Sequence, residues 1–214
     1  MSRRPPHNFV AILEDADESI DSSSKEKLCE QLYDGVLLNN KKKASIYWVD
    51  KESNKNCFML LARGLSICWG ENNDYWEWIA FQETSDMEVE VAVLRKVCWL
   101  QVTGKFRTIA LAPMTKYEIA FVVKLRDPND QWDSPVTFTV TLPNGKKEEC
   151  FKSLRREPQP RWEHIAICEF VMSPENVGEL TFALNERGPY WKSGLVIKGV
   201  SFRPVRDPHE TLGI

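Results

Sequence analysis

The feature that most constrains the fold is an alternation of apolar and polar side chains with a period of two, which recurs from near residue 44 onward. In segment 88–93, Val89, Val91 and Val93 alternate with Glu88 and Glu90. This alternation is typical of a β-strand with one buried face. Further segments that we predict to be strands are 65–69, 75–81, 97–102, 117–125, 136–142, 162–171, 179–184 and 195–203.

Turn-forming residues separate these segments. They cluster at 70–74, 103–104, 127–130, 143–145 and 185–188. The Pro-Asn-Gly sequence at 143–145 predicts a hairpin. About ten short strands with no helix between them predict an all-β sandwich or barrel.

The N-terminal part of the chain has a different pattern. Residues 1–22 combine acidic and small side chains and predict a disordered tail. Ser23 and Glu26 fit a capping box for one helix over 24–39, which ends at Asn39 and Asn40 before three lysines at 41–43. Its apolar face carries Leu28, Leu32, Val36 and Leu37. The predicted divisions are therefore a tail and helix (1–43), a sandwich domain (44–205) and a C-terminal tail (206–214).

Composition argues against several classes of protein. The net charge is −3 and the basic clusters at 41–43, 146–147 and 155–156 are short, so nucleic acid is not expected as the main partner. No apolar run approaches the roughly 18 residues of a membrane helix. No apolar segment follows Arg3 and Arg4, so we expect no secretory signal and a cytoplasmic protein.

The six cysteines allow two interpretations. They form no Cys-x-x-Cys pair, which argues against a zinc site. In a cytoplasmic protein most of them are expected to be buried thiols. The alternative is that one or two are exposed and form bridges to another chain in an oxidising environment.

Catalytic motifs are missing from the sequence. His164 is the one histidine outside the tails, and Cys168 lies four residues away on the same predicted strand face, about 13 Å along it. A Cys–His dyad is therefore not expected. No phosphate-binding, zinc-protease or nucleophile-elbow motif is present, although a glycosidase pair of carboxylates leaves no signature in a sequence.

The eight tryptophans are more informative. Trp69 and Trp76 flank a polar turn that contains Asn73 and Asp74, and Trp78 follows on the next segment. Sugars present C–H faces that stack on aromatic rings and hydroxyls that need polar partners, so such a turn suits a sugar site. Tryptophan at alternating strand positions is also typical of a core. That interpretation is favoured for Trp78, whereas Trp69 and Trp76 fit either.

Four ordered blocks carry a family resemblance. They are 57–70 with 75–78, then 97–105, then 111–117, and finally 191–200 with Arg203 and Pro204. Together they resemble the phloem lectin (phloem protein two) family over roughly residues 44–205. Residues 47–50, and the lack of an F-box-like region, resemble the cucurbit-type members, which are related to the Nictaba-like lectins.

The resemblance implies a jelly-roll-like β-sandwich that binds N-acetylglucosamine oligomers such as chitin fragments or the N-glycan core. It implies neither catalysis nor a cofactor or metal. Trp69 and Trp76 match the family's sugar-binding tryptophans, and Glu186, in a polar loop with Tyr190, is the nearest match to an acidic site residue. Cys68 and Gly64 stand where Nictaba-like members have Thr and Asp.

The resemblance also implies partners and a location. Such proteins are homodimers of phloem companion cells and sieve elements, with wound and defence roles, and can be disulfide-linked to filament-forming phloem protein. Some bind RNA. Two alternatives to a lectin therefore remain: a structural cross-linker that acts through exposed cysteines, and an RNA-binding carrier in phloem sap.

Overall fold

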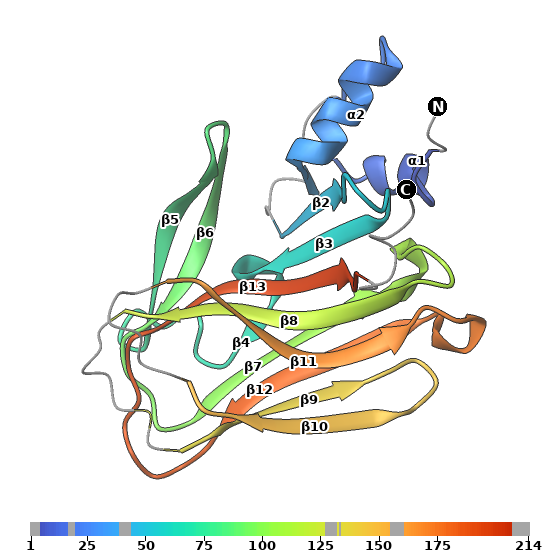
Figure 1. Cartoon of the computed structure of the whole chain (residues 1–214). Helices are drawn as coiled ribbons and strands as arrows, with labels where there is room; N and C mark the ends of the chain where they lie inside the picture. Colours follow the sequence, from blue (N-terminus) through green and yellow to red (C-terminus); the bar gives the residue numbers. More distant parts are fainter. Residues whose placement is uncertain are drawn as a thin grey trace.

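Two packed β-sheets make up most of the molecule (Figure 1). The computed structural model describes residues 5–16, 20–38, 44–126, 132, 134–154 and 161–206. Its architecture confirms the predicted all-β, jelly-roll-like sandwich.

The larger sheet has eight strands. They are β1 (Val36–Leu38), β2 (Ser45–Val49), β3 (Asn56–Leu61), β5 (Trp76–Thr84), β6 (Met87–Leu94), β8 (Lys116–Leu125), β11 (Glu163–Val171) and β13 (Leu195–Pro204). β13 pairs with β3, β6 and β8, so it lies at the centre of the sheet. The β5–β6 hairpin projects away from the sandwich (Figure 1).

The smaller sheet has five strands in the order β10-β9-β12-β7-β4. They are β4 (Ser66–Ile67), β7 (Leu100–Arg107), β9 (Val136–Thr141), β10 (Lys147–Lys152) and β12 (Glu179–Glu186). The predicted hairpin at 143–145 connects β9 to β10, and Gly145 takes its left-handed position at φ 86°. Short 3-10 turns, η1 (Ala62–Gly64), η2 (Thr108–Ala110) and η3 (Pro174–Asn176), connect other strands.

Aromatic rings fill the space between the sheets. Phe121 of β8 contacts Phe138 of β9 at 5.2 Å between ring centroids, and Phe106 of β7 stacks on Phe202 of β13 at 4.0 Å. Burial of these rings supplies much of the hydrophobic stabilisation of a sandwich.

The predicted turn at 103–104 is wrong, because both residues lie inside β7. A Cβ atom on Gly104 would lie only 2.3 Å from the Phe182 ring of the neighbouring strand. The glycine therefore allows a close approach within the sheet rather than a reversal of the chain.

The predicted helix is shorter than expected. It is α2 (Lys25–Asp34), with the Ser24 hydroxyl accepting the Lys27 N–H at 3.2 Å as its N-cap. Gly35, at φ 103°, ends the helix, and the next three residues form β1. Val36 and Leu37 thus belong to the sheet, contrary to the prediction.

The predicted disordered tail is also wrong for residues 5–16 and 20–22, which are part of the fold. Helix α1 (Phe9–Leu13) buries Ile12 in the core, and Ala16 forms a β-bridge to Leu38. The buried Asn56 side chain donates to the His7 carbonyl at 2.6 Å and to the Ala110 carbonyl at 2.8 Å. These hydrogen bonds attach the segment to the sandwich.

Several predictions fall outside the described residues. They are the helix end at 39–40, the lysines at 41–43, the turn at 127–130, the basic pair at 155–156 and all of the C-terminal tail after Arg206. Among the helices that the structure describes, none has the length and apolar character needed to cross a bilayer.

Candidate functional site

Three loops meet at one end of the sandwich, on the left in Figure 1 and away from α1 and α2. They are residues 68–75 between β4 and β5, 95–99 between β6 and β7, and 187–194 between β12 and β13. The Arg95 N–H donates to the Tyr75 carbonyl at 2.8 Å, and Val97 and Lys192 exchange two backbone hydrogen bonds. These bonds fix the loops relative to one another.

Trp69 lies on the first of these loops and is 60% exposed. Its backbone is left-handed, at φ 62°, which is rare for a bulky side chain. The Gly70 N–H donates to the Ile67 carbonyl and the Asn72 N–H to the Trp69 carbonyl, both at 2.9 Å. The Tyr75 ring supports the indole at 5.9 Å between centroids. The loop therefore holds a large aromatic surface in solvent.

The two polar residues that we predicted beside it, Asn73 and Asp74, are exposed on the same turn. The Asn72 side chain accepts the Asp74 N–H at 2.9 Å and shapes the turn. Asp74 also lines an open depression of about 680 Å³, together with Arg95, Lys96, Arg126 and Gly194. Trp69, Asn73 and Asp74 thus share one accessible surface.

Trp76 does not share it. The side chain is 1% exposed, and its Nε1–H donates to the Cys68 carbonyl at 3.1 Å. The prediction that Trp76 stacks on a sugar is therefore wrong for this structure, because no face of the ring is open. Trp78, which we expected in the core, packs against it half-buried, with the Arg63 guanidinium 3.6 Å from its ring centroid.

Glu186, at the end of β12, is also buried. Its carboxylate pairs with the Lys192 ammonium and accepts the Gly188 N–H at 2.9 Å. Only 8% of Glu186 is exposed, at the edge of a depression that Asn185 and Arg187 also line, so it does not take the open position beside Trp69 that we predicted. A buried carboxylate needs such partners, and here they leave it a supporting part in the loop.

Lys192 is the residue that sequence reasoning missed. It is fully buried, and its ammonium donates to the carbonyls of Cys98 at 2.6 Å, Tyr190 at 3.1 Å and Gly188 at 3.2 Å. Burial lowers the pKa of Lys192 below the ordinary lysine value. Nothing in the sequence distinguishes this lysine from a solvated one.

Tyr190 lies half-buried beside the same ammonium, 4.4 Å from its ring centroid. Its hydroxyl is buried, and no described residue forms a hydrogen bond with it. Part of the Tyr190 side chain is exposed while its hydroxyl is not, so its contact with a sugar stays a prediction.

Two other tryptophans are exposed on these loops. Trp99 is 50% exposed with the Arg187 guanidinium 4.4 Å from its ring centroid, and Trp191 is 61% exposed with the Lys96 ammonium at 5.9 Å. Both lie in blocks that carry the family resemblance, but their exposure could not be read from the sequence.

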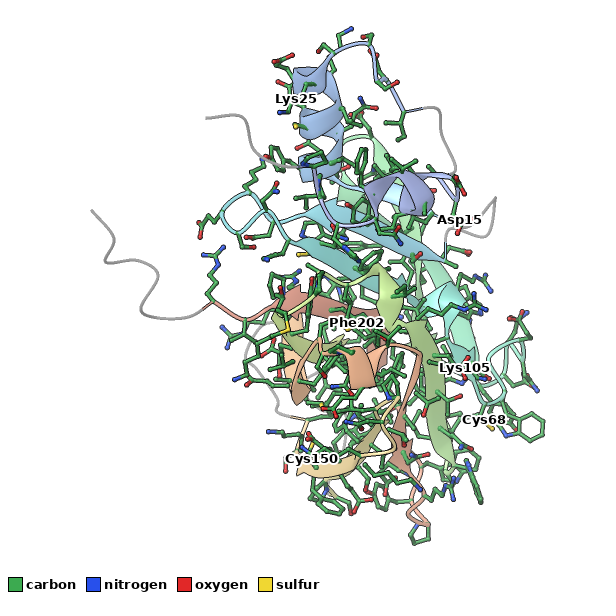
Figure 2. All side chains as sticks on the ribbon, turned by 90° about the vertical axis from the view of Figure 1, so that its right-hand side faces the viewer. Asp15, Lys25, Cys68, Lys105, Cys150 and Phe202 are labelled. Atoms are coloured by element: carbon green, nitrogen blue, oxygen red, sulfur yellow. The ribbon has the colours of Figure 1, made fainter. Side chains whose placement is uncertain are left out.

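Strand register sets the spacing of the site. The Cys68 N–H donates to the Gln101 carbonyl at 2.9 Å, and Gln101 pairs with Asn185. Adjacent strands lie about 4.8 Å apart, so the Cys68 and Asn185 backbones are about 10 Å apart. Figure 2 shows the loop with Cys68 projecting from the body of the molecule.

The residues tested for catalysis do not come together. A β-bulge between Ala166 and Cys168 leaves His164 exposed and Cys168 buried. The prediction that the two share one strand face is therefore wrong. Within the described ranges, no three His, Cys, Asp or Glu side chains gather to hold a metal ion.

Comparison with known proteins identifies the family of the chain. Residues 55–204 match the family model described as phloem protein 2. A protein named phloem protein 2-like A1, from Arabidopsis thaliana, is 47% identical over 204 residues, covering 94% of this chain and 82% of that protein. A protein named lectin, from Luffa acutangula, is 38% identical, covering 92% of this chain and 94% of that protein.

Among solved structures, a xylan-binding domain from Paenibacillus barcinonensis is a weak match. Its TM-score is 0.36 at 14% identity, over 69% of this chain and 89% of that domain. The family model spans the smaller sheet, all of the larger sheet except β1 and β2, and all three loops of the site. The chain belongs to the phloem protein 2 family.

Proposed function

We propose that this chain is a non-catalytic lectin that binds N-acetylglucosamine oligomers, such as chitin fragments and the N-glycan core, at the Trp69 loop. The observation that carries the proposal is the 60% exposure of Trp69 in a left-handed backbone beside polar side chains. The kinship with a protein named lectin supports it.

Stacking supplies the main attraction. A pyranose ring presents a face of C–H groups, and the exposed indole offers a matching flat, electron-rich surface. Tyr75 packs behind the indole, which reduces the side-chain entropy that binding would cost. A fixed ring next to solvent is therefore better suited to stacking than a mobile one.

Polar groups give orientation. Asn73 and Asp74 are exposed on the same turn and can exchange hydrogen bonds with sugar hydroxyls or an acetamido group. In this proposal Trp76, Glu186 and Tyr190 support the loops of the site, and Trp76 and Glu186 do not themselves contact the sugar. Trp76 holds the Cys68 carbonyl, while Glu186 and Tyr190 surround Lys192.

Calorimetric titration of the protein with chitotriose tests the proposal. Cellotriose, which has the same linkage without the acetamido group, is the matched control. We expect saturable binding of chitotriose and weaker binding of cellotriose. No heat from either ligand at millimolar concentration would overturn the proposal.

A second candidate, thiol-mediated cross-linking to filament-forming phloem protein, is favoured by one observation. Cys29, Cys68, Cys98 and Cys150 are partly exposed free thiols. Non-reducing electrophoresis of wounded tissue, with and without prior thiol blocking, tests this role. A high-mass species that forms despite blocking would contradict it.

The remaining parts of the proposal concern context. We place the protein in the cytoplasm of phloem companion cells and sieve elements, as a homodimer with a wound and defence role. RNA binding is the weakest part. The net charge of the chain is −3, and Lys146 of one basic pair forms an ion pair with Glu148 at 2.7 Å. Both features reduce the positive charge that would attract RNA phosphates.

A further inference from the structure

The outer face of the five-stranded sheet is hollowed into a groove lined mainly by threonines, with a few charged side chains. On β7, Leu100 and Val102 point into the core, so Gln101, Thr103 and Lys105 point outward. Two adjoining depressions, of about 470 Å³ and about 300 Å³, follow this face and share Thr139. In Figure 2, Lys105 and Cys68 lie toward one edge of this sheet, and Cys150 of β10 lies at the opposite edge.

Hydroxyl groups line the larger depression. Thr139 of β9, Ala183 of β12, Thr103 of β7 and Ser66 of β4 form one row across four strands, in register. The row spans about 14 Å at the usual strand spacing. Thr103, Thr139 and Ala183 are each only partly exposed, as expected on a hollowed face. The small Ala183 forms the floor between hydroxyls that can each donate and accept.

The charges on this face are balanced. Lys105 forms an ion pair with Glu179 at 3.0 Å, and Arg187 stacks on Trp99 near Glu149. Such a lining offers no net field for a polyanion, but it complements an uncharged chain rich in hydroxyl groups. The groove therefore fits a neutral oligosaccharide better than a nucleic acid.

The groove continues into the Trp69 loop. Asn185 and Thr137 line the smaller depression, and Asn185 pairs with Gln101, whose carbonyl accepts the Cys68 N–H. The Asn185 amide oxygen is buried and accepts no hydrogen bond from any described residue. Trp69 follows Cys68 directly, so the Trp69 loop begins at the row of the sheet that carries Gln101 and Asn185.

We propose that this groove is an extended subsite that binds the further sugar units of an oligosaccharide whose first units stack on Trp69. The inference rests on the proposed lectin function and adds chain-length selectivity to it. The ligand is an uncharged, extended oligosaccharide, held in the groove by the threonine hydroxyls.

Titration with chitobiose and chitohexaose tests the subsite. The variant Thr103→Val/Thr139→Val removes two groove hydroxyls and keeps the branched shape that suits a strand. We expect its chitohexaose affinity to fall about five- to tenfold, because two neutral hydrogen bonds are lost, with less than about a twofold change for chitobiose. Thr84→Val, on the exposed β5, is the control and should change neither affinity.

The outcomes separate the two proposals. Unchanged chitohexaose affinity in the double variant, with chitobiose still bound, overturns the subsite alone. Equal losses for both oligomers also overturn it, because the groove would then not select for length. Failure of the wild-type protein to bind either oligomer overturns the lectin proposal and the subsite with it. A change from dimer to monomer in sedimentation of the double variant would instead identify the groove as a self-interface.

Discussion

At the scale of single residues, Trp69 combines an exposed ring with an unfavourable backbone. A left-handed conformation costs roughly 1–2 kcal/mol for a residue with a Cβ atom. The loop hydrogen bonds around Asn72 and Gly70 hold Trp69 in this conformation. Such strain is common at binding sites, where it fixes a side chain in position.

The left-handed backbone of Trp69 leads to a prediction about the stability of two variants. Trp69→Gly and Trp69→Ala both remove the ring, but only glycine adopts φ 62° without penalty. We expect Trp69→Gly to be more stable than Trp69→Ala by about 1 kcal/mol in urea denaturation, which reverses the usual order of these residues. Equal stabilities would show that the loop relaxes once the ring is gone.

The sequence predicted a sugar site around Trp69 but not which of the two tryptophans beside the turn is exposed. A polar turn between tryptophans indicated a sugar site, and Trp69 is exposed in it. Trp76 has the same local pattern yet is buried, because β5 begins at that residue and directs it into the core. Which side a side chain takes depends on where the strand starts, and strand ends are the least certain part of a sequence prediction.

At the scale of elements, Lys192 and Glu186 connect two loops to the end of β12. One buried ammonium satisfies carbonyls from residues 98, 188 and 190, so it fixes loops 95–99 and 187–194 together. Removing one partner of a buried ion pair leaves an uncompensated charge, which typically costs about 3–5 kcal/mol.

A double-mutant cycle measures this connection. We expect Lys192→Met to lower the free energy of unfolding by about 3–5 kcal/mol. Lys192→Met combined with Glu186→Gln should cost less than the sum of the single variants by about 1–3 kcal/mol. The exposed pair Lys105–Glu179 is the control and should show little coupling. Additive losses at Lys192 and Glu186 would contradict the described contact.

The alternation along a half-exposed strand made several strands predictable, whereas β2 and β3 were missed although the equally buried β8 and β13 were predicted. β6 and β9 alternate along the chain, and we predicted both. β2 and β3 lie inside the larger sheet with the helices nearby, and their nearly continuous burial removes the alternation. The helix prediction ran past Asp34 because Val36 continues the apolar spacing, although Gly35 ends the helix.

At the scale of the whole molecule, the sandwich divides the cysteines into two groups. Cys57 and Cys168 are buried, and burial raises the pKa of each thiol to about 12. For Cys168 a hydrogen bond with the Glu148 carboxylate adds to the effect. At pH 8 only about one in ten thousand of these thiols would be ionised.

Alkylation with iodoacetamide at pH 8, followed by peptide mass spectrometry, tests this division. We expect Cys29, Cys68, Cys98 and Cys150 to be labelled in the folded protein, because they are partly exposed. Cys57 and Cys168 should react only after denaturation. Rapid labelling of Cys57 in the folded protein would contradict the described burial.

The central claim is that Trp69 provides the sugar-binding surface, and chitotriose titration of two variants tests it most directly. Met114 is the matched control, because it is 78% exposed and has a left-handed backbone at φ 53°. It lies just before the first residue of β8, and the ten residues of this strand separate it from the site loops by about 30 Å. We predict that Trp69→Ala loses at least about tenfold in affinity, while Met114→Ala binds like the wild-type protein. Wild-type affinity in a folded Trp69→Ala variant would contradict the account.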